Sequence, residues 1–269
     1  LDSIAYTEVL SFVKRISLAL ESHGITRGDR AAILSENRPE WALADYGCLC
    51  AGVIDVPIYP TLTSSQVAYA LKDSGAKLVF VSSYEQMIKV LEAVVECSQE
   101  IQIVVFDSLS ELPAGISSWV EFLESGAASL LPAISDEDFR RSALEARPDD
   151  VATIIYTSGT TGDPKGVMLT HNNISSNVQV CSTLLPIVAG LDNTVSFLPL
   201  SHILQRTADY LFFGTGCRIG YPRSMPTLIK DMGVIRPTVV VSVPRIYEKI
   251  YNNVMDASGI KKALINWAA

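Results

Sequence analysis

Residues 151–167 read VATIIYTSGTTGDPKGV, and the rest of the chain is interpreted from this stretch. The first seven residues are mostly apolar or β-branched and predict a buried strand. The residues that follow combine three glycines with several hydroxyl side chains and one lysine, Lys165. Glycines let backbone N–H groups approach an oxyanion closely, and hydroxyls and a lysine can donate to it. The stretch therefore predicts a strand followed by a loop that wraps phosphate groups.

This loop differs from the common nucleotide-binding motifs. The P-loop of kinase-like proteins needs GxxxxGK followed by Ser or Thr. Counted from Gly159, the second glycine of that motif falls on Pro164, and Gly166 follows the lysine. A GxGxxG pattern is absent as well. The structural alternative is a polar turn between a strand and a helix, and the length of the Ser/Thr/Gly run followed by Pro-Lys-Gly argues against it.

Strand-like and helix-like segments alternate on both sides of the loop. Before it, strands are predicted at 30–34, 53–59, 77–81 and 102–106, and helices at 7–24, 39–51, 65–74 and 84–97. After it, helices are predicted at 173–185, 205–213, 227–232 and from 245, and strands at 195–200, 217–222 and 238–244. This alternation predicts an α/β fold of mainly parallel sheets flanked by helices.

Two segments are expected to be less regular. Pro57 lacks a backbone N–H, so the strand at 53–59 is predicted to be an edge strand or an irregular one. Residues 108–148 show no clear periodicity and are expected to form a surface connection. That connection suggests two sub-lobes, at about 1–148 and 149–269.

Composition excludes several classes of protein. Hydrophobic residues make up 48% of the 269 residues and charged residues 19%, which excludes a disordered chain. The chain has 29 acidic and 21 basic residues, a net charge of −8, whereas a nucleic-acid-binding protein shows a basic surface. Residues 85–150 alone hold 14 acidic and 4 basic side chains and are predicted to form a solvated acidic surface.

Cysteine usage and hydropathy indicate the compartment. The five cysteines form no CxxC pair, and with only three histidines a zinc site is not expected. This usage fits a reducing, cytoplasmic environment. No apolar stretch reaches about 18 residues. The longest apolar region, 41–59, is broken by Asp45 and Asp55. We therefore expect no transmembrane helix and at most peripheral contact with a membrane.

The segment TSGTTGDPKGVMLTH, residues 157–171, resembles the signature of the AMP-forming adenylate enzymes, which include acyl-CoA synthetases, adenylation domains and luciferases. Residues 6–41, 51–80 and 195–207 are similar to further blocks of that family. The block IRPTVVVSVPRIYEKIY at 235–251 is most like the long-chain fatty-acid branch. The resemblance implies a partial N-terminal AMP-binding domain of a long-chain fatty-acid–CoA ligase.

The resemblance also implies a reaction and its substrates. Such a ligase uses ATP and Mg²⁺ to convert a fatty acid into an acyl-adenylate and pyrophosphate, and coenzyme A then accepts the acyl group. Two alternatives stay open. One is another adenylate former, acting on a medium-chain, aromatic or amino acid. The other is a non-catalytic nucleotide-binding module, although the loop lysine and hydroxyls are intact.

Candidate site residues follow from the resemblance, position by position. The polyphosphate would be held by the residues Thr157, Ser158, Gly159, Thr160, Thr161, Gly162 and Lys165. Thr157 would also contact the magnesium ion, and Lys165 and His202 would act in catalysis. His202 in LPLSH matches a histidine near the carboxylate and the α-phosphate, the alternative being a hydrogen-bonded core histidine.

Four further positions carry expectations. The long-chain branch usually has Glu-Arg after this histidine, whereas here Gln205 precedes Arg206, which is either charge-bearing at the site or structural. Arg245 is expected to form a salt bridge, and His171 to be a helix-capping or surface histidine. The helical region after the loop could direct its N-terminus at the phosphates.

The family's later motifs do not occur in the chain. They are a Tyr-Gly-x-Thr-Glu block, an aspartate for the ribose and a small C-terminal domain with a lysine. We therefore expect the chain to be an internal piece of a longer protein, with the C-terminal domain absent and little or no activity on its own.

Overall fold

The structure is a computed structural model that describes residues 3–128, 134–157 and 163–255. Within these residues a seven-stranded sheet has the order β5-β4-β3-β1-β2-β6-β7. All its neighbouring strands are parallel except the antiparallel pair β6–β7. The strands are β1 (Arg30–Leu34), β2 (Ile54–Ile58), β3 (Leu78–Val81), β4 (Gln102–Val105), β5 (Ile116–Ser118), β6 (Val151–Thr157) and β7 (Lys165–Thr170). The α/β fold with a mainly parallel sheet is thus confirmed.

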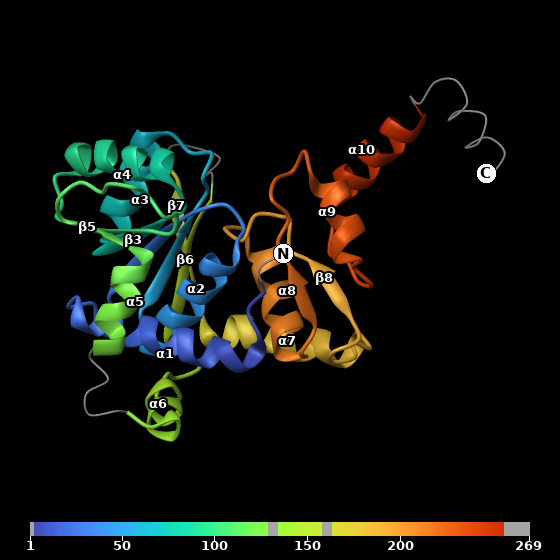
Figure 1. Ribbon diagram of the computed structural model, residues 1–269, viewed down its shortest axis with the longest axis horizontal. Helices are drawn as coiled ribbons and strands as arrows, with labels where there is room; N and C mark the ends of the chain where they lie inside the picture. Colours follow the sequence, from blue (N-terminus) through green and yellow to red (C-terminus); the bar gives the residue numbers. More distant parts are fainter. Residues whose placement is uncertain (1–2, 129–133, 158–162, 256–269) are drawn as a thin grey trace.

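Helices cover both faces of this sheet (Figure 1). One face carries α1 (Tyr6–Ser22), α2 (Pro39–Ala51) and α5 (Trp119–Ala128), and the other carries α3 (Ser64–Ser74) and α4 (Tyr84–Cys97). Successive strand residues point to opposite faces. Accordingly Ala31 and Ile33 belong to one hydrophobic cluster, and Ala32 and Leu34 to the other. Both faces of the sheet are buried under helices, as is typical of parallel sheets.

A second lobe lies beside the sheet lobe (Figure 1). It contains α7 (His171–Leu184), β8 (Asn193–Val195), α8 (Ile203–Gly214), β9 (Arg218–Gly220), α9 (Leu228–Ile235) and α10 (Pro244–Met255). β8 and β9 form a small parallel sheet. The main sheet continues across the expected boundary at 148, because β6 and β7 pair with the strands of the first sub-lobe.

The prediction for 108–148 as a plain surface connection was wrong. This stretch contains β5 and α5, as well as α6 (Asp136–Ala143). β5 extends the sheet beside β4, and α5 buries Phe122 and Leu123 against the core. The three-residue strand is too short to give a period-2 pattern, so its pairing comes from the neighbouring strand and not from its own sequence.

Of the two alternatives predicted for the strand at 53–59, an edge strand or an irregular one, the edge strand was wrong. β2 lies between β1 and β6 and pairs with β1 along its whole length. The N–H of Ile54 donates to Asp29 on the β1 side, so the N position of Pro57 faces β6, since backbone groups alternate sides. β2 pairs with β6 through Asp55 and Thr153 alone. The missing N–H of Pro57 therefore falls where little pairing exists.

In the second lobe, the predicted strand at 195–200 is shorter than expected, and the predicted strand at 238–244 is not formed. Of 195–200 only Val195 belongs to a strand, β8. The segment 238–244 forms no strand in the described structure, apart from one isolated bridge between Thr194 and Val239. β8 is three residues long, so it offers little edge for a third strand to pair with.

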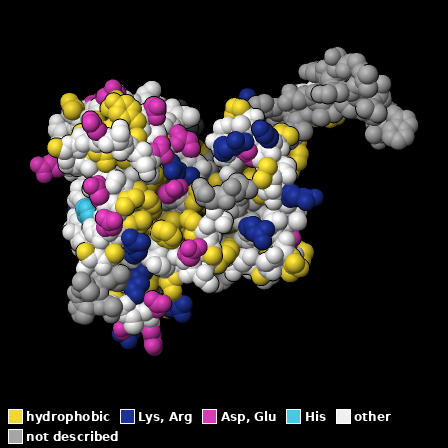
Figure 2. Space-filling model, viewed as in Figure 1, with side chains coloured by type: hydrophobic (Ala, Val, Ile, Leu, Met, Phe, Trp, Pro, Cys, Tyr) yellow, Lys and Arg dark blue, Asp and Glu magenta, His cyan; other side chains and the backbone are white. Residues whose placement is uncertain are grey.

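The expected acidic surface is present. Figure 2 shows most of the visible Asp and Glu over the sheet lobe, whereas Lys and Arg lie over both lobes. Acidic side chains of α4, α5 and α6, including Glu96, Glu124 and Glu137, are exposed. The five cysteines are free thiols. Among the described residues, no helix has the length and apolar composition needed to cross a bilayer.

Candidate functional site

The phosphate-loop candidate lies at the tip of the β6–β7 hairpin. Thr157 ends β6, Lys165 begins β7, and the two residues are a register pair. Both side chains are exposed. The predicted loop residues Ser158, Gly159, Thr160, Thr161 and Gly162 lie outside the described residues. The structure therefore brings together the two ends of the loop, a hydroxyl and a lysine, at the carboxyl end of a buried strand.

The element after the loop is a strand, β7, and not a helix. The predicted helix after the loop is α7, and β7 lies between it and the loop. Gly166 in β7 leaves room for two side chains of β6. A Cβ at Gly166 would lie 2.8 Å from Cγ2 of Ile154 and 3.3 Å from Cζ of Tyr156.

Tyr156 fixes the base of the loop to the sheet lobe. Its hydroxyl donates to Oδ2 of Asp73 in α3 at 2.7 Å. Its ring meets that of Tyr69 edge-on, with centroids 6.2 Å apart. Burial, followed by the Asp73 carboxylate, raises the pKa of Tyr156, so the phenol stays protonated as a donor.

We expect Tyr156→Phe to lower the free energy of unfolding by about 1 kcal/mol, because one hydrogen bond to a carboxylate is lost. Urea-induced unfolding measures the change. Tyr84→Phe is the matched control: Tyr84 is 54% exposed, and a change near zero is expected there. Equal effects of the two substitutions would contradict the role given to Asp73.

His202 lies at the start of α8 and is exposed, so it is not a core histidine. It is the N-cap residue, and its Nδ1 accepts a hydrogen bond from the N–H of Leu204 at 3.2 Å. This bond satisfies one of the free donors at the helix N-terminus and sets the ring orientation. The second ring nitrogen, Nε2, makes no hydrogen bond to another described residue.

His202 and the end of β6 lie at the same edge of the main sheet. The hydroxyl of Ser201, next to His202, donates to the carbonyl oxygen of Ile58 at the end of β2 at 3.2 Å. β2 and β6 are parallel and in register at Asp55 and Thr153. Three residues further along each strand, Ile58 of β2 corresponds to Tyr156 of β6. Ligands of parallel sheets bind at this carboxyl edge.

Arg206 has a structural position, which resolves the alternative left open by the sequence. It is 1% exposed and donates to Asp45 at 2.5 and 3.2 Å, to Asp55 at 2.6 Å and to the hydroxyl of Thr153 at 2.8 Å. Its Nε also donates to the hydroxyl of Tyr210 at 2.7 Å. Arg206 thus ties α8 to α2, β2 and β6, the strand that leads into the loop.

Sequence reasoning missed this cluster, although its signal was present. Asp45 and Asp55 interrupt an apolar region and were interpreted only as breaks in a membrane span. Both are at most 1% exposed, and a buried carboxylate requires a partner. Burial raises the pKa of Asp55 to about 7, and the charge of Arg206 opposes that rise.

The contacts of Gln205 explain why an amide occupies the position at which the long-chain branch usually has a glutamate. Its Oε1 accepts from the N–H of Leu198 at 3.3 Å, and its Nε2 donates to Asp209 at 2.7 Å. A glutamate could make the first bond but would place a second carboxylate against Asp209. Asp209 is 3% exposed, and burial raises its pKa to about 6.

The raised pKa of Asp209 predicts a pH-dependent contribution to the free energy of unfolding. Because this pKa is raised above the ordinary value of 3.8, the folded state binds the proton more tightly than the unfolded state does. The stabilisation is full below pH about 4 and is lost as the pH rises through about 6, a loss of about 3 kcal/mol. We expect Asp209→Asn to remove this component. Urea unfolding of both proteins at pH 4.5 and 7 measures it, and identical pH dependence would contradict the prediction.

The remaining two predicted positions play lesser parts. His171 is the first residue of α7 and is half-buried; the helix is capped by Thr170, not by His171. Burial lowers the pKa of His171. Arg245 is exposed, and no ion pair joins it to another described residue, so the expected salt bridge is not observed.

A cavity of about 400 Å³ lies between α2, α7 and α8 and includes His171 in its wall. The other wall residues are mainly apolar or aromatic: Tyr46, Leu49, Ile174, Ser175, Val178, Gln179 and Tyr210. No group of three or more His, Cys, Asp or Glu side chains suited to a metal ion occurs in the described part of the chain.

The chain is similar in sequence to curated fatty-acid ligases. It is 35% identical over 252 residues to the long-chain-fatty-acid–CoA ligase FadD15 of Mycobacterium bovis, covering 93% of this chain and 40% of that protein. It is 33% identical to the peroxisomal long chain acyl-CoA synthetase 7 of Arabidopsis thaliana, covering 96% and 37% of the two chains. The chain thus spans about 40% of the length of these relatives.

Solved structures share the fold. The luciferase-like enzyme of the mealworm Zophobas morio superposes with a TM-score of 0.77 at 21% identity, covering 95% of this chain and 56% of that one. The long-chain-fatty-acid–CoA ligase FadD1 of Archaeoglobus fulgidus gives 0.76 at 22% identity, covering 96% and 48%. The family model described as AMP-binding enzyme matches residues 2–266. The chain therefore belongs to the family of AMP-binding enzymes.

Proposed function

We propose that this chain is the nucleotide-handling part of an AMP-forming ligase that activates a long-chain fatty acid and transfers it to coenzyme A. The observation that carries the proposal is the hairpin pair of Thr157 and Lys165 at the tip of β6 and β7. It holds both ends of the Ser/Thr/Gly loop at the carboxyl edge of the sheet. The relatives named as long-chain ligases supply the substrate class.

In this proposal the loop binds the polyphosphate of ATP. Its hydroxyls and backbone N–H groups at Ser158, Gly159, Thr160, Thr161 and Gly162 donate to phosphate oxygens, and Lys165 adds a positive charge. The exposed hydroxyl of Thr157 is positioned to be a ligand of nucleotide-bound magnesium. Mg²⁺ would neutralise charge that develops on the phosphates.

The chemistry requires a carboxylate oxygen to attack the α-phosphate and pyrophosphate to leave. A free carboxylate is a poor acylating agent, and the adenylate provides a good leaving group for the later attack of a thiol. His202 would orient the carboxylate or donate to the α-phosphate through Nε2, because Nδ1 is engaged with Leu204. Positioning and charge stabilisation are the main contributions expected at such a site.

The remaining parts of the proposal concern organisation and location. We propose that residues 1–148 and 149–269 act as two sub-lobes of an N-terminal domain that functions with a C-terminal domain. Residues 1–269 alone are then expected to turn over little. We also propose that the protein works in the cytoplasm, with at most peripheral contact with membranes, since the cysteines are free thiols.

The test uses the full-length gene product with ATP, Mg²⁺ and coenzyme A. Palmitate, octanoate, benzoate and a mixture of amino acids are supplied separately, and acyl-CoA and AMP are detected by mass spectrometry. We expect palmitoyl-CoA and AMP in equal amounts. Activity only with another acid would favour a different adenylate former, and activity with none would favour a non-catalytic module.

A further inference from the structure

The segment 196–202, which leads to His202, has no regular secondary structure. Ser196, Leu200 and Ser201 are nevertheless buried, at no more than 2% exposure. Buried backbone N–H and C=O groups need hydrogen-bond partners. At the ends of the segment, the N–H of Ser196 donates to the carbonyl oxygen of Gly220 at 2.9 Å and that of His202 to Pro199 at 2.9 Å. Between them, side chains bond the backbone of Leu198 and Leu200.

Asn37 supplies three of the four observed side-chain hydrogen bonds to this backbone, and Gln205 supplies the fourth. The Nδ2 of Asn37 donates to the carbonyl oxygens of Leu198 at 2.7 Å and Ser196 at 3.2 Å, and also to the Ser196 hydroxyl at 3.3 Å. Its Oδ1 accepts from the N–H of Leu200 at 3.0 Å. The partners fix the amide orientation, because a flip would direct the NH₂ group at the Leu200 N–H. One side chain from the first sub-lobe thus bonds three alternate residues of an irregular segment in the second, namely Ser196, Leu198 and Leu200.

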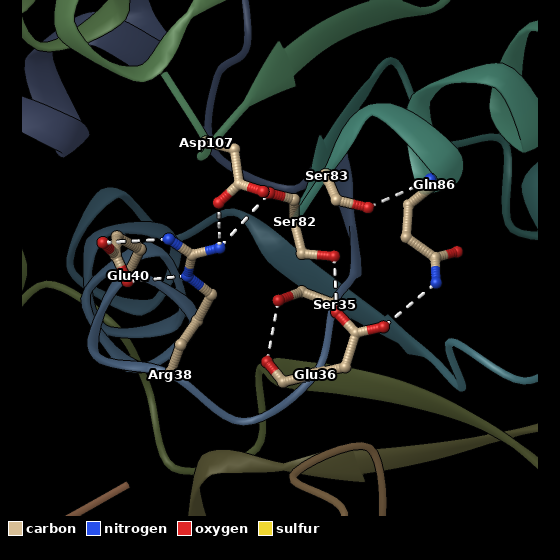
Figure 3. A network of polar contacts seen from close by, with 8 residues as sticks. All are labelled: Ser35, Glu36, Arg38, Glu40, Ser82, Ser83, Gln86 and Asp107. Atoms are coloured by element: carbon tan, nitrogen blue, oxygen red, sulfur yellow. Dashed lines mark hydrogen bonds and ion pairs between the residues drawn. The ribbon is translucent and has the colours of Figure 1, made fainter. Parts of the chain in front are cut away.

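The loop that carries Asn37 is itself held on both sides (Figure 3). On one side, Glu36 accepts from Ser82 Oγ at 2.5 Å and from Gln86 Nε2 at 3.1 Å. On the other side, Arg38 donates to Asp107 at 2.7 Å and to Glu40 at 2.8 Å. The loop joins β1 to α2 at the carboxyl edge of the sheet.

The figure shows that these partners come from separate elements around the loop. Ser82 directly follows β3, Gln86 belongs to α4, Asp107 follows β4, and Glu40 lies in α2. Arg38 also donates to the carbonyl oxygen of Ser82 at 3.2 Å. Because the hydrogen bonds of Glu36 and Arg38 fix the loop on both sides, the side chain of Asn37 is in a defined position to bond the backbone of residues 196–200.

We propose that Asn37 is a positioning residue for His202. It acts through the backbone of residues 196–200 and sets where α8 and its N-cap histidine begin. The functional part of this inference rests on the proposed adenylation activity. The structural part, the hold of Asn37 on the segment, stands on the four hydrogen bonds alone.

Hydrogen–deuterium exchange tests the structural part without any activity. In the full-length gene product, Asn37→Ala is expected to raise amide exchange in the peptide that covers 196–202 by about tenfold or more, since one lost hydrogen bond of about 1.4 kcal/mol corresponds to that factor. The peptide that covers β1 should exchange at the wild-type rate. Unchanged exchange in 196–202 would overturn the proposal.

A double-mutant cycle tests the functional part. Asn37→Asp keeps the size of the side chain but removes both donated backbone bonds, and it is expected to lower kcat of palmitate-dependent ATP–pyrophosphate exchange by about 100-fold. In a His202→Ala background the same change should lower it by less than about threefold, because the residue acts through His202. The KM for ATP should change little in either background.

Gln102→Glu is the matched control. It also replaces an amide that donates to a backbone carbonyl, that of His23 at 2.9 Å, by a carboxylate at an exposed position. This variant should keep the wild-type kcat. Equal losses from Asn37→Asp with and without His202 would overturn the positioning role. Absence of ATP–pyrophosphate exchange in the wild type would overturn the proposed function instead. The hydrogen–deuterium exchange result would still decide whether Asn37 orders residues 196–202.

Discussion

Replacing Arg206 with methionine is expected to lower the free energy of unfolding by about 3–5 kcal/mol, because it leaves two buried carboxylates without their counter-ion. Asp45 and Asp55 are both at most 1% exposed, and Arg206 bonds both. Urea-induced unfolding followed by tryptophan fluorescence measures the change. Trp41 is a local probe, since its ring lies 5.6 Å from the guanidinium carbon.

Two variants make this prediction sharp. Arg141→Met removes an exposed ion pair with Asp138 and should change stability by no more than about 0.5 kcal/mol. Adding Asp55→Asn to Arg206→Met should recover part of the loss, because one unpaired buried charge is removed. If Arg206→Met were as mild as Arg141→Met, the cluster would not be what joins α8 to the sheet.

Replacing Lys165 with alanine is expected to lower palmitate-dependent ATP–pyrophosphate exchange by about 100-fold or more, the size of effect seen when one donor to developing charge is removed. Lys165 is exposed at the first position of β7, opposite Thr157. Lys165 forms no ion pair with another described residue, so its charge is available for the proposed contact with the polyphosphate.

Lys230→Ala is the control for this substitution, because Lys230 is an exposed lysine of α9 and should leave the exchange rate unchanged. The unfolding midpoint of Lys165→Ala should match that of the wild type, since an exposed side chain is lost. A slow exchange accompanied by a large drop in stability would contradict a direct role in phosphate binding.

Local chemistry made much of the first sub-lobe predictable. β1 and α2 have the predicted boundaries, 30–34 and 39–51, because a short apolar run and a proline at the first helical position mark them clearly. The alternation of such segments was enough to predict the parallel sheet. The strand β6 was predicted from its apolar run, and the loop from its glycines and hydroxyls.

Features that depend on distant partners were not predictable in this way. Pro57 indicates an edge strand locally, yet the interior position is tolerated because β2 and β6 share a single register pair. β7 was missed because its sequence, KGVMLT, has no alternation of apolar and polar residues; Val167 and Met168 are both exposed at the edge of the sheet. The isolated bridge of Val239 shows that β-branched residues alone do not make a strand.

Dependence on distant partners also explains which residues of the candidate site were predicted and which were missed. Thr157 and Lys165 were found from one contiguous motif, and His202 from another. Arg206 joins Asp45 across 161 residues of sequence, and Asn37 joins Leu200 across 163. No spacing rule connects residues so far apart, although buried charges in an apolar run indicate that a partner exists. The chemistry-bearing residues were therefore more visible in sequence than the residues that hold them.

ATP–pyrophosphate exchange by the full-length gene product, with Mg²⁺ and with or without palmitate, tests the central claim most directly. Exchange reports the reversible formation of the acyl-adenylate and does not depend on coenzyme A. We expect exchange that requires palmitate and is lost in Lys165→Ala. Exchange that is absent, independent of any carboxylic acid or unaffected by Lys165→Ala would contradict the assignment of the β6–β7 loop as the ATP site of a fatty-acid ligase.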